Sequence, residues 1–90
     1  MGKRVWVIGI ANSEADGVRI NNFYGTTDEV KKLLIRLVNT DKENDEENFE
    51  YGTETTDEIG DELNELNAYA TYSDYHIDYT AIPWDKVIPL

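Results

Sequence analysis

The side chains with the greatest capacity for chemistry in this chain are carboxylates, and most of them lie in one segment. Twelve of the 19 acidic residues fall between Asp41 and Glu65, beside one basic residue, Lys42, so these residues carry a net charge of −11. The remaining 65 residues hold seven acidic and seven basic side chains. Interspersed charges would provide solubility with less self-repulsion. A charge confined to residues 41–65, here called the acidic segment, therefore indicates a binding surface.

Calcium is one ligand that such a segment could hold. Asp41, Glu43 and Asp45 occupy alternate positions, as in an EF-hand loop. The sixth position of that loop should be Gly and is Glu46, and the twelfth should be a bidentate Glu and is Gly52. The sequence therefore predicts no EF-hand, and we expect neither a metal site nor another cofactor, although weak binding of divalent cations stays open.

Catalytic groups are few. His76 is the sole histidine, there is no cysteine, and Ser73 and Asp74 lie too close to it in sequence to form a triad. The six glycines match neither the dinucleotide-binding fingerprint nor the phosphate-binding loop. We therefore expect no enzyme.

The second half of the acidic segment has the spacing of a helix. Thr55 and Glu58 form a capping-box pattern, which predicts a helix from about Thr56 to Leu66. Its carboxylates recur at intervals of four residues, at Asp57, Asp61 and Glu65 and at Glu58 and Glu62. Carboxylates on adjacent turns are about 5–6 Å apart, close to the spacing of phosphates along one strand of nucleic acid. A groove lined with Lys and Arg would accept either.

In these features the chain resembles a class of small acidic proteins from bacteriophages and mobile elements, the anti-CRISPR proteins that act as DNA mimics. The resemblance rests on short length, the absence of cysteine, and the acidic run from Asp41 to Glu47 that continues through Asp57-Glu58 and Asp61-Glu62. It implies a stoichiometric inhibitor in the cytoplasm of a bacterial host. Such an inhibitor occupies the site where an RNA-guided nuclease reads the short duplex motif beside its target.

The predicted function is accordingly inhibition by binding to the basic groove of a nucleic-acid-binding protein, with no direct contact to nucleic acid or membrane. The carboxylates supply an anionic track, and two aromatic residues fix the register. The predicted partner-binding residues are Asp41, Glu43, Asp45, Glu46, Glu47, Phe49, Glu50, Tyr51, Glu54, Asp57, Glu58, Asp61, Glu62 and Glu65.

An alternative function uses a different surface. Tyrosines are frequent in the last third of the chain, and a row of them on a strand could form an interaction or assembly module. The acidic segment would then serve solubility alone. The residues of this alternative are Tyr69, Tyr72, Tyr75 and Tyr79.

The elements that position these groups fit one small domain spanning residues 1–90, because 90 residues with 40% hydrophobic content suffice for one core. The apolar run from Val5 to Ala11 predicts a strand buried on both faces. It is at the lower limit of length for the apolar region of a secretory signal and far too short for a membrane span. Asp16-Gly17 predicts a tight turn into a second, antiparallel strand, Val18 to Tyr24.

A helix should follow that strand. Thr26 and Glu29 form a capping box, and apolar residues recur with helical spacing from Val30 to Val38, which predicts a helix from Thr27 to about Asn39. Beyond it we expect an acidic loop. The fold class is thus α+β, with a small antiparallel sheet packed by one amphipathic helix, and the acidic loop and acidic helix at its periphery.

The last third of the chain has the composition of extended structure. It forms either one long strand or a hairpin, with Ser73-Asp74 as the turn between Ala68–Ser73 and Tyr75–Ala81, and Pro83 ends the last strand. The sequence determines neither the strand order nor the oligomeric state.

Overall fold

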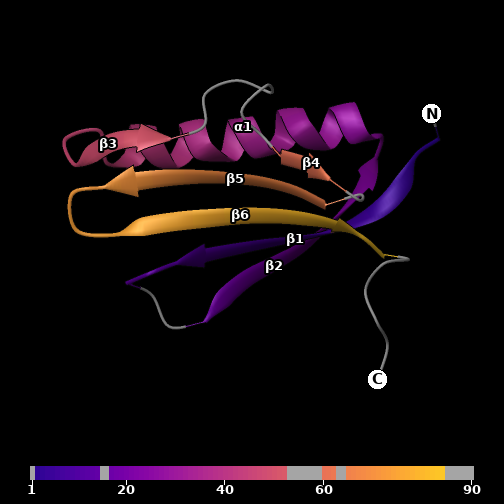
Figure 1. Ribbon diagram of the computed structural model, residues 1–90, viewed down its shortest axis with the longest axis horizontal. Coiled ribbons are helices and arrows are strands. Elements are labelled where there is room, and N and C mark those ends of the chain that lie inside the picture. Colours follow the sequence, from indigo (N-terminus) through magenta and orange to yellow (C-terminus); the bar gives the residue numbers. More distant parts are fainter. Residues whose placement is uncertain (1, 15–16, 53–59, 63–64, 85–90) are drawn as a thin grey trace.

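The structure is a computed structural model that describes residues 2–14, 17–52, 60–62 and 65–84. One long helix lies across a twisted sheet, and the N-terminal hairpin forms the edge of the sheet farthest from the acidic segment (Figure 1). In chain order the elements are β1 (Arg4–Asn12), β2 (Val18–Gly25), α1 (Thr27–Asn44), β3 (Phe49–Gly52), β4 (Gly60–Glu62), β5 (Glu65–Tyr72) and β6 (His76–Pro83).

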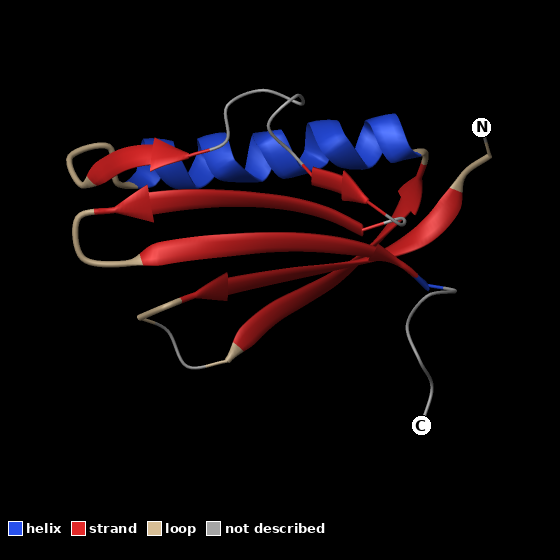
Figure 2. Cartoon of the chain, in the orientation of Figure 1, coloured by secondary structure: helices blue, strands red, loops and turns tan. Residues whose placement is uncertain are grey.

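Every pairing in the sheet is antiparallel, and the strand order is β2-β1-β6-β5-β3, with the short β4 also paired to β5. β3 pairs with the end of β5 near Tyr72 and β4 with the end near Glu65, so both lie along the same edge of β5 (Figure 2). The predicted α+β class, an antiparallel sheet packed by one amphipathic helix, is confirmed.

β1 supplies the centre of the core through one of its two faces. Trp6, Ile8 and Ile10 are buried, and the indole Nε1 of Trp6 donates a hydrogen bond to the carbonyl of Gly25 at 3.1 Å. The alternate residues lie on the opposite, open face, where Val5 is exposed and Val7 is half-buried. The prediction that β1 is covered on both faces is therefore wrong, because the described helix covers one face alone.

The start of α1 follows the capping box in its sequence. The Thr26 hydroxyl accepts from the amide of Glu29, and a carboxylate oxygen of Glu29 accepts from the amide of Thr26. Val30, Leu34 and Val38 are fully buried against the sheet. The predicted end near Asn39 is wrong: the helix continues to Asn44, so the expected acidic loop is in part the last turn of α1.

The second predicted helix, Thr56 to Leu66, is also wrong where the structure describes it. Gly60–Glu62 and Glu65–Leu66 are strand residues, and Asp61 pairs with Leu66 in an antiparallel ladder. Residues 56–59 and 63–64 lie outside the described residues. Leu66 begins a strict alternation of buried and exposed residues along β5, which is the period of a strand with one covered face.

The last third of the chain is a hairpin that turns at Ser73-Asp74, one of the two predicted forms. Tyr72 and Tyr79 face α1 and are 2% and 0% exposed, Tyr75 is half-buried, and Tyr69 is exposed on the open face. The alternative interaction surface built from these four tyrosines is therefore wrong, since two of them are core residues. Among the described residues no helix is long and apolar enough to cross a membrane.

Candidate functional site: an acidic corner between α1 and β3

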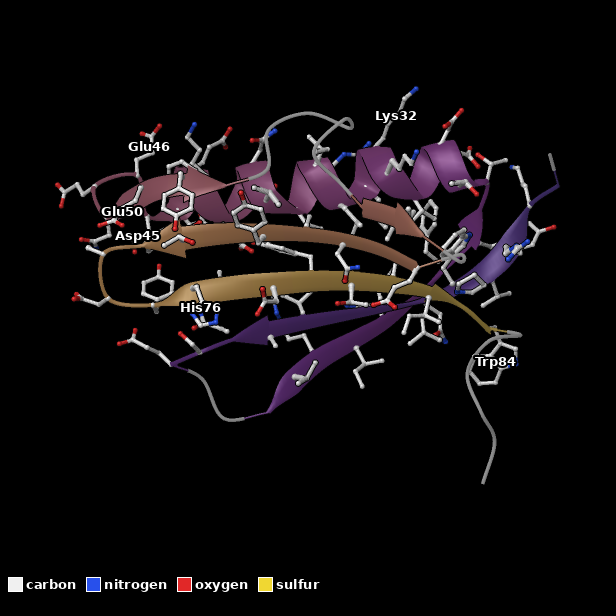
Figure 3. All side chains as sticks on the ribbon, viewed as in Figure 1. Lys32, Asp45, Glu46, Glu50, His76 and Trp84 are labelled. Carbon is white, nitrogen blue, oxygen red and sulfur yellow. The ribbon has the colours of Figure 1, made fainter. Side chains whose placement is uncertain are left out.

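The first half of the acidic segment gathers at the corner where α1 ends and β3 begins. Asp41 and Glu43 lie in the last turn of α1, Asp45 is its C-cap, and Glu46 lies in the turn that follows. Figure 3 shows Asp45, Glu46 and Glu50 together at this end of the molecule, far from Trp84 at the other end. The corner therefore brings together carboxylates from a helix end, a turn and a strand.

Asp41 is committed to holding the fold. Its Oδ2 accepts a hydrogen bond of 2.6 Å from the hydroxyl of Tyr79, a residue of β6 that is fully buried. The guanidinium of Arg19 in β2 also approaches Asp41 Oδ2 at 3.7 Å. Because Tyr79 must bury its phenol to fill the core, Asp41 supplies the acceptor that its hydroxyl needs.

Asp45 has an equivalent role one turn later. Its Oδ2 accepts from the hydroxyl of Tyr75 at 2.5 Å, and its Oδ1 accepts from the side-chain amide of Asn48 at 2.9 Å. The Asn48 side-chain oxygen in turn accepts from the hydroxyl of Ser73. This network ties the turn after α1 to the turn between β5 and β6.

The tyrosines beneath this corner are held in their neutral form. Burial, followed by the hydrogen bond to Asp41, raises the pKa of Tyr79 far above its usual value of 10.0. The hydrogen bond to Asp45 is the main cause that raises the pKa of Tyr75. Tyr72 stacks on Tyr75 with ring centroids 4.6 Å apart, and its buried hydroxyl has no hydrogen-bond partner among the described residues. Burial likewise raises the pKa of Tyr72.

Four glutamates of the same corner are arranged differently. They are exposed, and their carboxylates make no hydrogen bond or ion pair among the residues that the structure describes. One of them, Glu50, is the extra residue at a shift in register between β3 and β5, a position that bends a strand and redirects its side chain. We call these residues the glutamate surface: Glu43, Glu46, Glu47 and Glu50.

The two predicted aromatic anchors differ in exposure. Phe49 is half-buried, packs edge-on against Tyr72 with centroids 5.4 Å apart, and has the ammonium of Lys42 above its ring at 4.7 Å. Tyr51 is 57% exposed on the open face, where its ring meets that of Tyr69 at 6.2 Å. Tyr51 thus offers a partner more surface than Phe49 does.

The other predicted site residues lie farther along the chain. Glu65 is exposed at the start of β5, and Asp61 and Glu62 lie in β4 beside it. Glu54, Asp57 and Glu58 lie outside the described residues. The helical track predicted from Asp57 through Glu65 does not exist in its described part, because those residues are strands. Among the described residues there is no cluster of three or more His, Cys, Asp or Glu side chains that could hold a metal ion.

The tyrosine hydroxyls at this corner were absent from the sequence-based prediction. Asp41 and Asp45 are 38 and 30 residues from the tyrosines that they bind. The sequence around Asp41 and Asp45 contains no local pattern that distinguishes them from the neighbouring glutamates.

Comparison with known proteins gives no relative from which a function could be transferred. No family model matches the chain, and no curated protein or solved structure matches it. The function must therefore be argued from the acidic corner itself.

Proposed function

We propose that this protein is an inhibitor that binds the basic groove of a nucleic-acid-binding protein and thereby excludes DNA. The observation that carries the proposal is the glutamate surface. Its four carboxylates are exposed on adjoining elements, within a segment whose net charge is −11. Like charges held together in this way repel one another, and a surface rich in Lys and Arg relieves that repulsion.

The arrangement suits a competitor for nucleic acid. A groove that binds DNA gains affinity when its cations displace the counterions of the phosphates, and a fixed cluster of carboxylates offers it the same gain. The hydrogen bonds from Tyr75 and Tyr79 hold the helix end that presents the glutamates, so less order has to be gained on binding. The exposed ring of Tyr51 adds a contact that is not electrostatic.

The partner that we propose is an RNA-guided nuclease of a bacterial defence system, which makes this chain an anti-CRISPR protein. Such a nuclease reads a short duplex motif with arginines before it opens the target, so a small acidic protein that covers those arginines blocks the first step. The support for this partner is the size, charge and cysteine-free composition of the chain.

A tagged pull-down from bacterial lysate tests the proposal. Nucleic acid is digested first, the lysate is divided between low and high salt, and the bound proteins are identified by mass spectrometry. We expect capture of a nucleic-acid-binding enzyme at low salt that is lost at high salt or when duplex DNA is added. Capture that resists both salt and DNA would contradict the proposed mechanism.

A further inference from the structure

The two edges of the sheet are protected to very different degrees. At the acidic edge, β5 is covered by β3 and β4, which have four and three residues, and the pairing of β3 contains a shift in register. Short strands, bulges and charges are the usual means by which proteins prevent an edge from pairing with another chain. The acidic edge has all three.

The opposite edge has no short strand and no bulge, and it has a single charged residue. β2 is eight residues long, pairs with β1 in continuous register along its whole length, and contains no proline and no carboxylate. Its one charged residue, Arg19, is engaged by Asp41. Among the described residues no strand pairs with the outer side of β2. Although the chain has 19 acidic residues, β2 itself carries no negative charge that would repel a second copy.

An apolar hollow accompanies this edge. Between β2 and α1 lies a space of about 220 Å³ lined by Ile8, Asn21, Asn22, Phe23, Leu33 and Leu37. Phe23, Leu33 and Leu37 are half-buried there. On the open face of the same strand, Ile20 and Tyr24 are 67% and 65% exposed. Large apolar side chains therefore flank the unpaired backbone on both faces of the sheet.

We propose that a second copy of this chain pairs with β2, in antiparallel orientation about a twofold axis, to form a symmetric dimer with one continuous sheet. A register that places Asn22 opposite the partner's Asn22 also places Ile20 opposite the partner's Tyr24. Pairs of a β-branched and an aromatic residue are favourable neighbours across antiparallel strands. The edge is thus complementary to itself, as a twofold interface requires.

The net charge of the chain does not oppose this dimer. Strands lie about 4.8 Å apart, so β3 is about 20 Å from β2, more than two Debye lengths at physiological ionic strength. β3 lies at the opposite edge of the sheet from β2 (Figure 1), so pairing through β2 places the two copies of β3 at the outer ends of the combined sheet. The dimer leaves both glutamate surfaces exposed, so it is independent of the proposed inhibition.

Sedimentation of the full chain tests this dimer. From about 1 μM to about 1 mM, we expect a reversible shift from monomer to dimer. Ile20→Glu replaces the apolar side chain that faces Tyr24 of the other copy with a carboxylate, which loses its hydration on pairing, so it should raise the dissociation constant at least about tenfold. Asn39→Glu adds the same charge at an exposed position of α1 and should leave the constant unchanged. A protein that stays monomeric throughout, or an Ile20→Glu variant that dimerises like the wild type, overturns the proposal.

A crosslink tests the register. Because the chain has no cysteine, a single introduced thiol reports one contact. Opposed residues in antiparallel strands have Cα atoms about 4.5–5.5 Å apart, within the range of a disulfide. Under mild oxidation Asn22→Cys should give a covalent dimer, and Glu50→Cys, at the acidic edge, should not. Equal crosslinking of the two variants, or crosslinking of Glu50→Cys alone, contradicts pairing through β2.

Discussion

Carboxylates of two kinds lie side by side at the end of α1. Asp41 and Asp45 accept hydrogen bonds from Tyr79 and Tyr75, and these bonds fasten the helix to β6 and to the turn before it. The glutamate surface, on the same helix end, the following turn and β3, makes no such bond among the described residues. Residues that look alike in a run of acids therefore divide between holding the fold and facing solvent, and the second group alone is available to a partner.

Raising the pH should have the largest effect on the contacts beneath Asp41 and Asp45, because it acts on three tyrosines at once: Tyr72, Tyr75 and Tyr79. Their pKa values are raised in the folded protein, so below about pH 10 each phenol is neutral in both states and its stabilisation is complete. Above pH 10 the unfolded chain loses these protons first, and the free energy of unfolding falls as pH rises.

Urea unfolding at several values from about pH 9 to about pH 11 measures this dependence. A variant with both Tyr75→Phe and Tyr79→Phe should lose less stability over this range than the wild type. Both proteins contain the same lysines and arginines, so the difference between their slopes reports the two tyrosines. Identical slopes would show that the two hydroxyls are not held by the aspartates.

Removing one of the two aspartates should have the next largest effect on the free energy of unfolding. Asp41→Ala leaves the hydroxyl of buried Tyr79 without its acceptor, which should lower the free energy of unfolding by about 1–3 kcal/mol. Glu43→Ala, two residues away on the same helix, should change it by less than about 0.5 kcal/mol. Chemical denaturation of the two variants compares them directly, and equal losses would erase the distinction between the two kinds of carboxylate.

A smaller contrast should appear between two stacked tyrosines. Tyr75→Phe removes the hydrogen bond to Asp45 and should cost about 0.5–1.5 kcal/mol. Tyr72→Phe removes a buried hydroxyl without a partner in the described part of the chain, so stability should stay the same or rise. Thermal or urea unfolding of the pair tests this. A loss in Tyr72→Phe as large as that in Tyr75→Phe would mean that the Tyr72 hydroxyl has a partner.

Local sequence patterns predicted the elements that depend on them. The strand around Trp6 and the capping box at Thr26 were found where expected, Gly17 adopts a positive φ of 87° before β2, and the turn at Ser73-Asp74 is one of the two forms left open. Each is determined by neighbouring residues, through alternation, positive φ or reciprocal capping bonds. The sequence was therefore sufficient to predict the α+β class and the start of α1 after Thr26.

The errors arose where distant contacts determine the structure. The helix was expected to end near Asn39 because its apolar pattern stops there, yet Asp41 and Asp45 hold the following turn against tyrosines more than 25 residues away. Leu66 fitted a helical period with residues before it, but it also begins the alternation of β5, and pairing with β6 decides between the two. The predicted binding surface, a row of carboxylates along a helix, is therefore replaced by the acidic corner between α1 and β3.

Neutralising the glutamate surface tests the central claim most directly. The variant with Glu43, Glu46, Glu47 and Glu50 each changed to Gln keeps both aspartates, so its unfolding free energy should match that of the wild type. Its affinity for the enzyme captured from lysate, measured by titration at low salt, should fall by about 100-fold or more. If the folded variant binds within about twofold of the wild type, the glutamate surface is not the binding site and the proposed inhibition is wrong.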